Sequence, residues 1–145
     1  PLWKPHATAS IAGLTLSHGK GEIARAMVDG IAAQVADLLG AIAADGVAVK
    51  ELRVDGGLTQ SHTLMQMQAD LAQVSIEVYP HPDATAMGVA NLAAMATNSA
   101  LNLGDFASAW KPSERYSPKW SADRAQSYLT KWRTLPANAM ESAHE

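Results

Sequence analysis

Apolar residues recur every three or four positions over several stretches of this chain, which is the spacing of an amphipathic helix. One long helix is predicted from Glu22 to the Asp45-Gly46 pair, because glycine favours the backbone conformation that ends a helix. The same spacing predicts helices over residues 61–73 and 84–95. The apolar face of the long helix is expected to consist of Ile23, Met27, Ile31, Val35, Leu38 and Ile42.

Short apolar runs lie between these helices. Residues 49–54 and 75–79 predict two strands, and residues 10–16 are a third candidate strand. A last helix is predicted over residues 122–134, with Ser121 as its N-cap, and residues 136–145 are expected to fray. Because helices and strands alternate along the chain, the predicted fold class is α/β.

Two glycines inside the predicted helices indicate close packing. Gly30 lies in the long helix, and Gly88 lies in the alanine-rich helix that Asp83 is expected to cap. Glycine inside a helix costs about 1 kcal/mol relative to alanine. We therefore expect a neighbouring element to approach each of these two helices closely.

The composition is that of a folded globular domain. Apolar residues make up 48% of the chain and charged residues 17%, with a net charge of −3. This acidic balance, without any basic cluster, argues against nucleic-acid binding. The absence of cysteine excludes disulfides and thiolate metal sites and favours a reducing cytoplasm. The sequence shows neither an apolar run long enough for a membrane span nor a signal peptide.

The candidate site is the segment LRVDGGLTQS, in which Gly56 and Gly57 separate a predicted strand from a predicted helix. Glycine lets another molecule approach the backbone, and the start of the helix offers free N–H groups. This arrangement suits an anion or a nucleotide, and it also suits an ordinary tight turn. Asp55 precedes the glycines, where it either holds the turn or orders water around a phosphate-bound metal.

Other candidate motifs are weaker. The segment GKGEIA, residues 19–24, fits a loose dinucleotide-binding pattern, but one long helix occupies the place where that pattern needs a second strand. The histidines lie in separate segments without the spacing of a zinc site, so we interpret them as loop and surface residues. We assign no metal ligands and no catalytic residue within this chain.

Three segments, in order along the chain, resemble one family. They are the lead-in PLWKPHATASIAGLT, the helix EIARAMVDGIAAQVADLL, and LRVDGGLTQSHTLMQMQADL followed by ATAMGVANLAAMA. Together they resemble the FGGY family of carbohydrate kinases over most of residues 1–135. The part that is most similar to the glycerol-phosphorylating members consists of Leu64, Met65, Gln66, Gln68 and Asp70.

The resemblance implies a ribonuclease-H-like, actin-like ATPase domain, of which residues 1–135 would form a C-terminal portion. It implies ATP and Mg²⁺ as cofactors and a small polyol or sugar as the acceptor of the phosphoryl group. Gly56 and Gly57 would lie against the adenine nucleotide. The family often has asparagine at the position of Ser61, so Ser61 either contacts the nucleotide or only caps the helix.

The resemblance also places the family's catalytic aspartate and acceptor-binding residues upstream of this chain. We therefore expect the chain to be the C-terminal part of an ATP-dependent kinase that acts on glycerol, and to be inactive without its N-terminal lobe. Lys4 and Thr8 depart from the family pattern in the lead-in.

Two other functions stay open at this point. The protein could be a kinase of the same family that acts on xylulose or on another pentose or polyol. It could also be a stand-alone nucleotide-binding module without catalysis. An incomplete actin-like lobe would expose a sheet edge and an apolar face, so pairing of the chain with itself is a further expectation.

Overall fold

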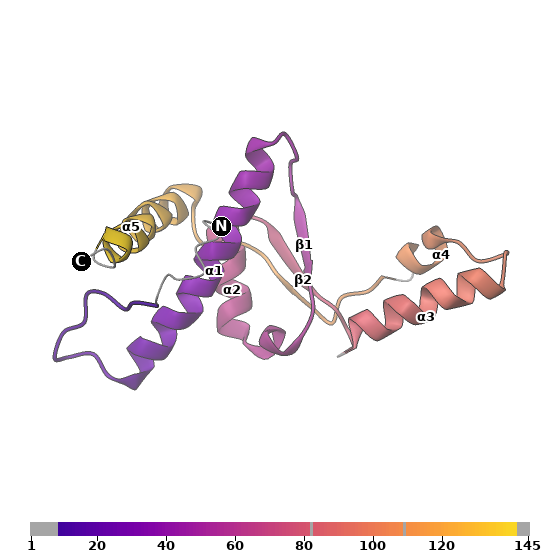
Figure 1. The fold of residues 1–145 in the computed structure, drawn as a ribbon, viewed down its shortest axis with the longest axis horizontal. Helices are drawn as coiled ribbons and strands as arrows, with labels where there is room; N and C mark the ends of the chain where they lie inside the picture. Colours follow the sequence, from indigo (N-terminus) through magenta and orange to yellow (C-terminus); the bar gives the residue numbers. More distant parts are fainter. Residues whose placement is uncertain (1–8, 82, 109, 142–145) are drawn as a thin grey trace.

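The computed structural model describes residues 9–81, 83–108 and 110–141, which form a mixed α/β domain (Figure 1). The lead-in with Lys4, His6 and Thr8, and the end with His144, lie outside the described residues. The elements in order are α1 (Lys20–Ala44), β1 (Glu51–Val54), the 3₁₀ turn η1 (Gly57–Gln60), α2 (His62–Ala72), β2 (Ser75–Val78), α3 (Ala84–Thr97), α4 (Leu103–Ser108), β3 (Glu114–Tyr116) and α5 (Ala122–Glu141). The predicted α/β class is confirmed.

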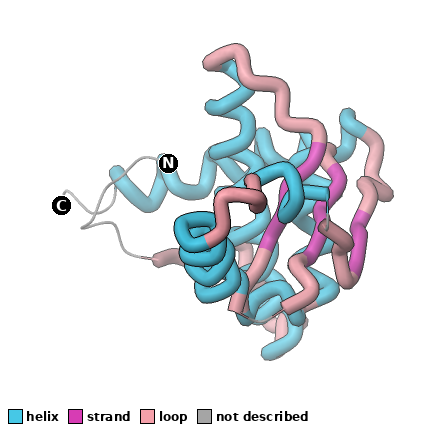
Figure 2. The backbone as a smooth tube through the Cα atoms, turned by 90° about the vertical axis from the view of Figure 1, so that its right-hand side faces the viewer, coloured by secondary structure: helices cyan, strands magenta, loops and turns pink. Residues whose placement is uncertain are grey.

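The three strands lie side by side in the order β1-β2-β3 (Figure 2). β1 and β2 are parallel, and β3 runs antiparallel to β2, with Arg53 opposite Glu77 and Glu77 opposite Arg115. Successive side chains of a strand point to opposite faces of the sheet. The apolar partners Leu52 and Ile76 therefore face the core, while the three charged residues occupy the other face, which we call the outer face.

The core lies between the inner face of the sheet, α2 and α1. Ile76 in the central strand is fully buried, and Leu64 and Met67 of α2 are 2% exposed. Leu129 of α5 belongs to the core. Trp120 and Tyr128 are partly buried and pack against the core. α2 is buried along most of its length, because it has neighbours on several sides.

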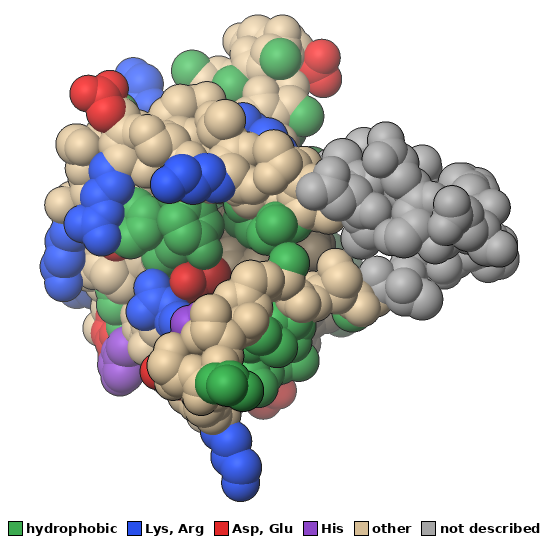
Figure 3. Space-filling view, turned by 90° about the vertical axis from the view of Figure 1, so that its left-hand side faces the viewer, with side chains coloured by type: hydrophobic (Ala, Val, Ile, Leu, Met, Phe, Trp, Pro, Cys, Tyr) green, Lys and Arg blue, Asp and Glu red, His purple; other side chains and the backbone are tan. Residues whose placement is uncertain are grey.

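The buried face of α1 differs from the predicted one. The helix buries the small residues Ala32, Ala33 and Ala36, while Met27 and Leu38 of the predicted face are 63% and 54% exposed. The alanine side chain is small, so this stripe allows α1 and α2 to pack closely. Figure 3 shows apolar side chains among charged ones on the side of the molecule that carries α5 and the start of α1.

The expectation that Gly30 and Gly88 face close neighbours is wrong within the described residues. A Cβ atom added at either glycine would meet no atom within 4 Å. α3, which contains Gly88, has no buried residue at all and projects away from the sheet together with α4 (Figure 1). Asp83 precedes α3 as predicted, but its side chain makes no capping hydrogen bond.

Two strand predictions are correct and one is wrong. β1 and β2 fall within the predicted runs, whereas residues 10–16 form no strand and are exposed. The third strand is instead β3, and α4 was not predicted either. α5 begins as predicted, with the Ser121 Oγ accepting a hydrogen bond from the Arg124 N–H at 3.3 Å, but it continues to Glu141.

By length and composition, α1 is the one helix of the described segments that could cross a membrane. Two of its acidic side chains, however, contact residues of α5. The Tyr128 hydroxyl lies 3.2 Å from the Asp29 Oδ2, and the Arg133 Nη2 lies 2.7 Å from the Asp37 Oδ1. These contacts, together with the packing against α2, identify α1 as a packed helix of this domain.

Candidate functional site

The glycine pair lies where β1 leaves the sheet. Because β1 and β2 are parallel, their carboxyl ends meet at one edge, and the Tyr79 N–H donates to the Val54 carbonyl at 2.8 Å there. In open α/β sheets this edge is the common place for a ligand. Only Asp55 separates Val54 from Gly56 and Gly57. The structure therefore places these two glycines at this edge of the sheet.

The backbone conformation of Gly56 requires glycine. Its φ of +94° and ψ of 174° fall in a region that residues with a Cβ rarely adopt. The turn that follows is held by the Gly56 carbonyl, which accepts hydrogen bonds from the Thr59 N–H at 3.1 Å and the Thr59 Oγ1 at 2.7 Å. A Cβ atom at Gly56 or Gly57 would meet nothing within 4 Å, so the space in front of both is open.

Ser61 joins the turn to α2. Its hydroxyl oxygen accepts a hydrogen bond from the Leu64 N–H at 3.3 Å, which is the contact of an N-cap. The capping role of Ser61 is therefore seen directly. Its contact with a nucleotide stays a prediction, for which its own O–H is the remaining donor.

An open cleft of about 620 Å³ lies beside this turn. Asp55 forms one side, and the first turns of α3 form the other, with Asp83, Thr85 and Val89. The rest of its lining is alanine from α3. The cleft thus combines apolar residues of α3 with two acidic residues, and the start of α3 adds backbone N–H groups.

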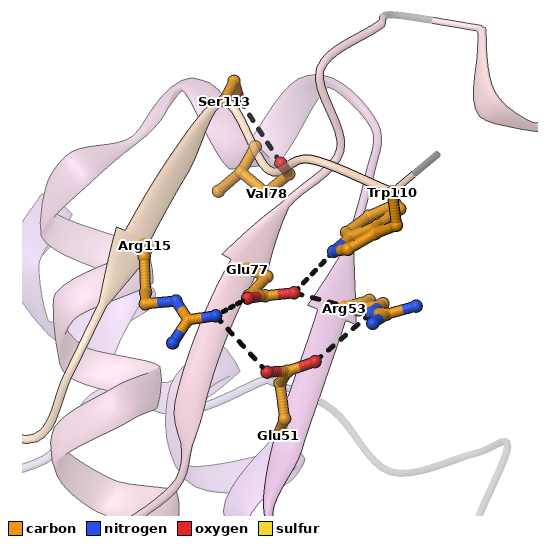
Figure 4. Close-up of polar contacts among 7 residues, drawn as sticks. All are labelled: Glu51, Arg53, Glu77, Val78, Trp110, Ser113 and Arg115. Carbon is orange, nitrogen blue, oxygen red and sulfur yellow. Dashed lines mark hydrogen bonds and ion pairs between the residues drawn. The ribbon is translucent and has the colours of Figure 1, made fainter. Parts of the chain in front are cut away.

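On the outer face of the sheet, Glu77 is buried in a polar network that the sequence did not predict (Figure 4). Its carboxylate is 2% exposed, accepts a hydrogen bond from the Trp110 Nε1 at 2.6 Å and pairs with the Arg115 guanidinium. The Arg53 Nε lies 3.5 Å away. Burial raises the pKa of Glu77, but the hydrogen bonds from Trp110 and Arg115 outweigh it, so the pKa lies below its ordinary value.

A second unpredicted group lies at the start of α2. The His62 Nδ1 is 2.6 Å from the Tyr116 Oη, and the Tyr116 hydroxyl donates to the Glu114 carboxylate. Burial and then the neighbouring carboxylate raise the pKa of Tyr116 to about 12. These contacts join the start of α2, which follows the glycine turn, to β3.

Replacing Gly56 by alanine tests the conformational requirement of the turn. We expect the free energy of unfolding to fall by about 1–3 kcal/mol, because the alanine Cβ disfavours this φ and ψ. Urea denaturation followed by circular dichroism would measure it. Gly57→Ala is a matched control, since both positions face open space but only Gly56 has a positive φ. Equal losses in both variants would contradict the argument.

Known proteins are similar to this chain along most of its length. A profile of the FGGY family of carbohydrate kinases, C-terminal domain, matches residues 1–97. A glycerol kinase of Bordetella parapertussis is 39% identical over 134 residues, which are 92% of this chain and 26% of that protein. The chain therefore spans about a quarter of the length of this curated relative.

Two solved structures share the fold. The crystal structure of Plasmodium falciparum glycerol kinase with ADP has a TM-score of 0.85 and 26% identity, and the match covers 94% of this chain and 28% of the other. Xylulose kinase from Rhodospirillum rubrum has a TM-score of 0.83 at 24% identity, covering 97% of this chain and 29% of the other. The second likeness concerns the fold alone. The predicted ribonuclease-H-like, actin-like fold is confirmed.

Proposed function

Because this chain belongs to the FGGY family of carbohydrate kinases, as a part of the C-terminal domain, we propose that the whole protein transfers a phosphoryl group from ATP to a hydroxyl of glycerol. The observation that carries the proposal is the match to glycerol kinase along nearly the whole chain, at 39% identity. Residues 1–135 would contribute part of the nucleotide site, while the acceptor would be bound by the upstream lobe.

The geometry beside the glycine turn supports a nucleotide site. The open space in front of Gly56 and Gly57 lets a planar base or a ribose lie against the backbone, and the alanine wall of the cleft is apolar, as a base requires. The related glycerol kinase structure was determined with ADP, which agrees with this assignment. We propose Gly56, Gly57 and the hydroxyl of Ser61 as the nucleotide-contacting groups.

The acidic residues of the cleft fit a magnesium–nucleotide complex better than a free nucleotide. Asp55 and Asp83 both line the cleft, and two carboxylates would repel bare phosphates. Carboxylate oxygens are ligands that Mg²⁺ prefers, and Mg²⁺ often takes one or two of them together with phosphate oxygens and water. No group of three or more metal-binding side chains occurs among the described residues. When bound, Mg²⁺ would neutralise charge on the phosphates.

A panel of acceptors tests the proposal on the whole protein. With ATP held constant, the rate of ADP formation would be measured with glycerol, xylulose, gluconate and no acceptor. We expect glycerol to give the highest kcat/KM. A faster reaction with the ketopentose would assign the protein to another acceptor of the same family, and no acceptor-dependent ADP formation would refute kinase activity.

The alternative of a stand-alone nucleotide-binding module makes a different prediction. The isolated chain holds only part of the cleft, so we expect it to bind ATP weakly. Isothermal titration that showed tight binding to the isolated chain would favour the module. We further propose a cytoplasmic location. Self-association stays a prediction that rests on β1, whose outer edge has no partner strand among the described residues.

A further inference from the structure

Trp110 links the outer face of the sheet to the connection that leads into α3. Its indole Nε1 donates to the buried Glu77 carboxylate at 2.6 Å, and the Arg53 guanidinium lies 4.4 Å from the ring centroid (Figure 4). The Tyr79 ring stacks on the indole with centroids 5.4 Å apart and an interplanar angle of 29°. Tyr79 is the first residue after β2, so the indole joins β1, β2 and the β2–α3 connection.

α3 begins shortly after Tyr79 and His81 along the chain. The helix has no buried residue, so the hydrophobic core does not hold it. The chain entering it is held at Tyr79 by Trp110 and by the bond to the Val54 carbonyl, and the His81 ring packs edge-on against Tyr79 at 5.7 Å. The cleft lies between Asp55 and the first turns of this same helix. A shift of α3 would therefore change the width of the cleft.

We propose that Glu77 and Trp110 are positioning residues that hold Tyr79, the residue after β2, and thereby set the distance between α3 and the glycine turn. Neither residue lines the cleft, so both act through α3. Glu77 suits the role because Arg115 and Arg53, from the two neighbouring strands, fix its carboxylate. The consequence for ATP rests on the proposed function, whereas the anchoring of α3 does not.

Steady-state kinetics of the whole protein would test the consequence for ATP. In Glu77→Gln we expect the KM for ATP to rise about tenfold, because a cleft of the wrong width misplaces the nucleotide. The KM for glycerol should stay within about twofold, since a purely ATP-side effect leaves acceptor binding alone. Trp110→Phe keeps an aromatic ring but loses the Nε1 donor, so the KM for ATP should rise less in this variant. It is the variant to use if Glu77→Gln does not fold.

Asp37→Asn is a matched control, because it weakens the ion pair between Asp37 and Arg133, which joins α1 to α5 away from the cleft. Neither KM should change in this variant. An unchanged KM for ATP in both test variants, or an equal rise of both KM values, would overturn the proposal.

Hydrogen exchange of the same whole proteins separates this proposal from the proposed function. We expect Glu77→Gln to speed exchange of the amides in residues 84–90 about tenfold relative to those of α2, because the local opening of α3 becomes easier. If the unaltered protein phosphorylates no acceptor, the proposed function fails. The exchange result still shows whether Glu77 and Trp110 hold the start of α3. Unchanged exchange in α3 would refute the positioning role of Glu77 and Trp110, regardless of the kinase activity.

Discussion

Replacing Ile76 by alanine is expected to lower the free energy of unfolding by about 4 kcal/mol, one of the two largest effects that we anticipate. Ile76 is fully buried in the central strand, with Leu52 and Tyr116 beside it on β1 and β3. Strands on both sides prevent the backbone from closing around the lost methyl groups, so a cavity remains. Urea denaturation should show a lower midpoint with an unchanged slope.

Leu92→Ala is the matched control for this substitution. Leu92 lies on α3 and is 59% exposed, so the same kind of truncation should cost no more than about 0.5 kcal/mol. A loss at Leu92 as large as the loss at Ile76 would show that α3 is packed against another part of the protein in solution. A loss below about 1 kcal/mol at Ile76 would contradict the core described above.

Helices α1, α2, α3 and α5 and the two parallel strands could be predicted because local spacing determines them. The buried side of α1 could not, because apolar residues lie on more than one side of this helix. Large residues such as Met27 and Leu38 suggested one face, yet the alanine stripe with Ala32 and Ala33 is the one that contacts α2. Periodicity shows that a helix is amphipathic, but the shape of its neighbour decides which stripe is buried.

β3 and the false strand at residues 10–16 show the same limit for strands. The sequence of β3, Glu114–Tyr116, has little apolar character, and it becomes a strand because β2 offers an open edge for it. Residues 10–16 have the composition of a strand but are exposed, without a partner strand in the described part of the chain. Strand formation thus depends on a partner strand, which for β3 is β2, far away in sequence.

The local structure around the candidate site residues could be predicted in part. Gly56 and Gly57 stood out because a strand, a turn and a helix follow one another along the chain, whereas Ser61 stood out through the family resemblance. The network around Glu77 could not be found this way, since Trp110 lies 33 residues further along the chain. A glutamate in a predicted strand was the one local signal, because a charged residue on a sheet is either solvated or paired.

The residues that most resemble glycerol-phosphorylating kinases turn out to have a structural role. Leu64, Met65, Gln68 and Asp70 are all at most 6% exposed in α2. Their burial gives them a role in the packing of α2, and packing does not by itself identify an acceptor. This is why the choice between glycerol and a pentose has to be made by measuring products.

Asp70 shows what that arrangement requires, and its replacement by alanine is the second large effect that we expect. The carboxylate is 4% exposed, and its Oδ1 accepts hydrogen bonds from the Lys119 N–H at 2.5 Å and the Trp120 N–H at 3.1 Å. The Gln66 Nε2 donates to the same oxygen at 3.2 Å. Asp70 thus fastens the segment before α5 to α2.

In Asp70→Ala we expect the free energy of unfolding to fall by about 3 kcal/mol, because two backbone N–H groups lose a charged acceptor and alanine offers no replacement. In Asp70→Asn the amide oxygen can still accept both bonds, so the loss should be about 1 kcal/mol. Trp120 packs on Tyr128 of α5, with ring centroids 5.7 Å apart, so its fluorescence should report loosening of this segment in the alanine variant before global unfolding. Equal losses in the two variants would show that the negative charge of Asp70, and not its position as an acceptor, holds α5 in place.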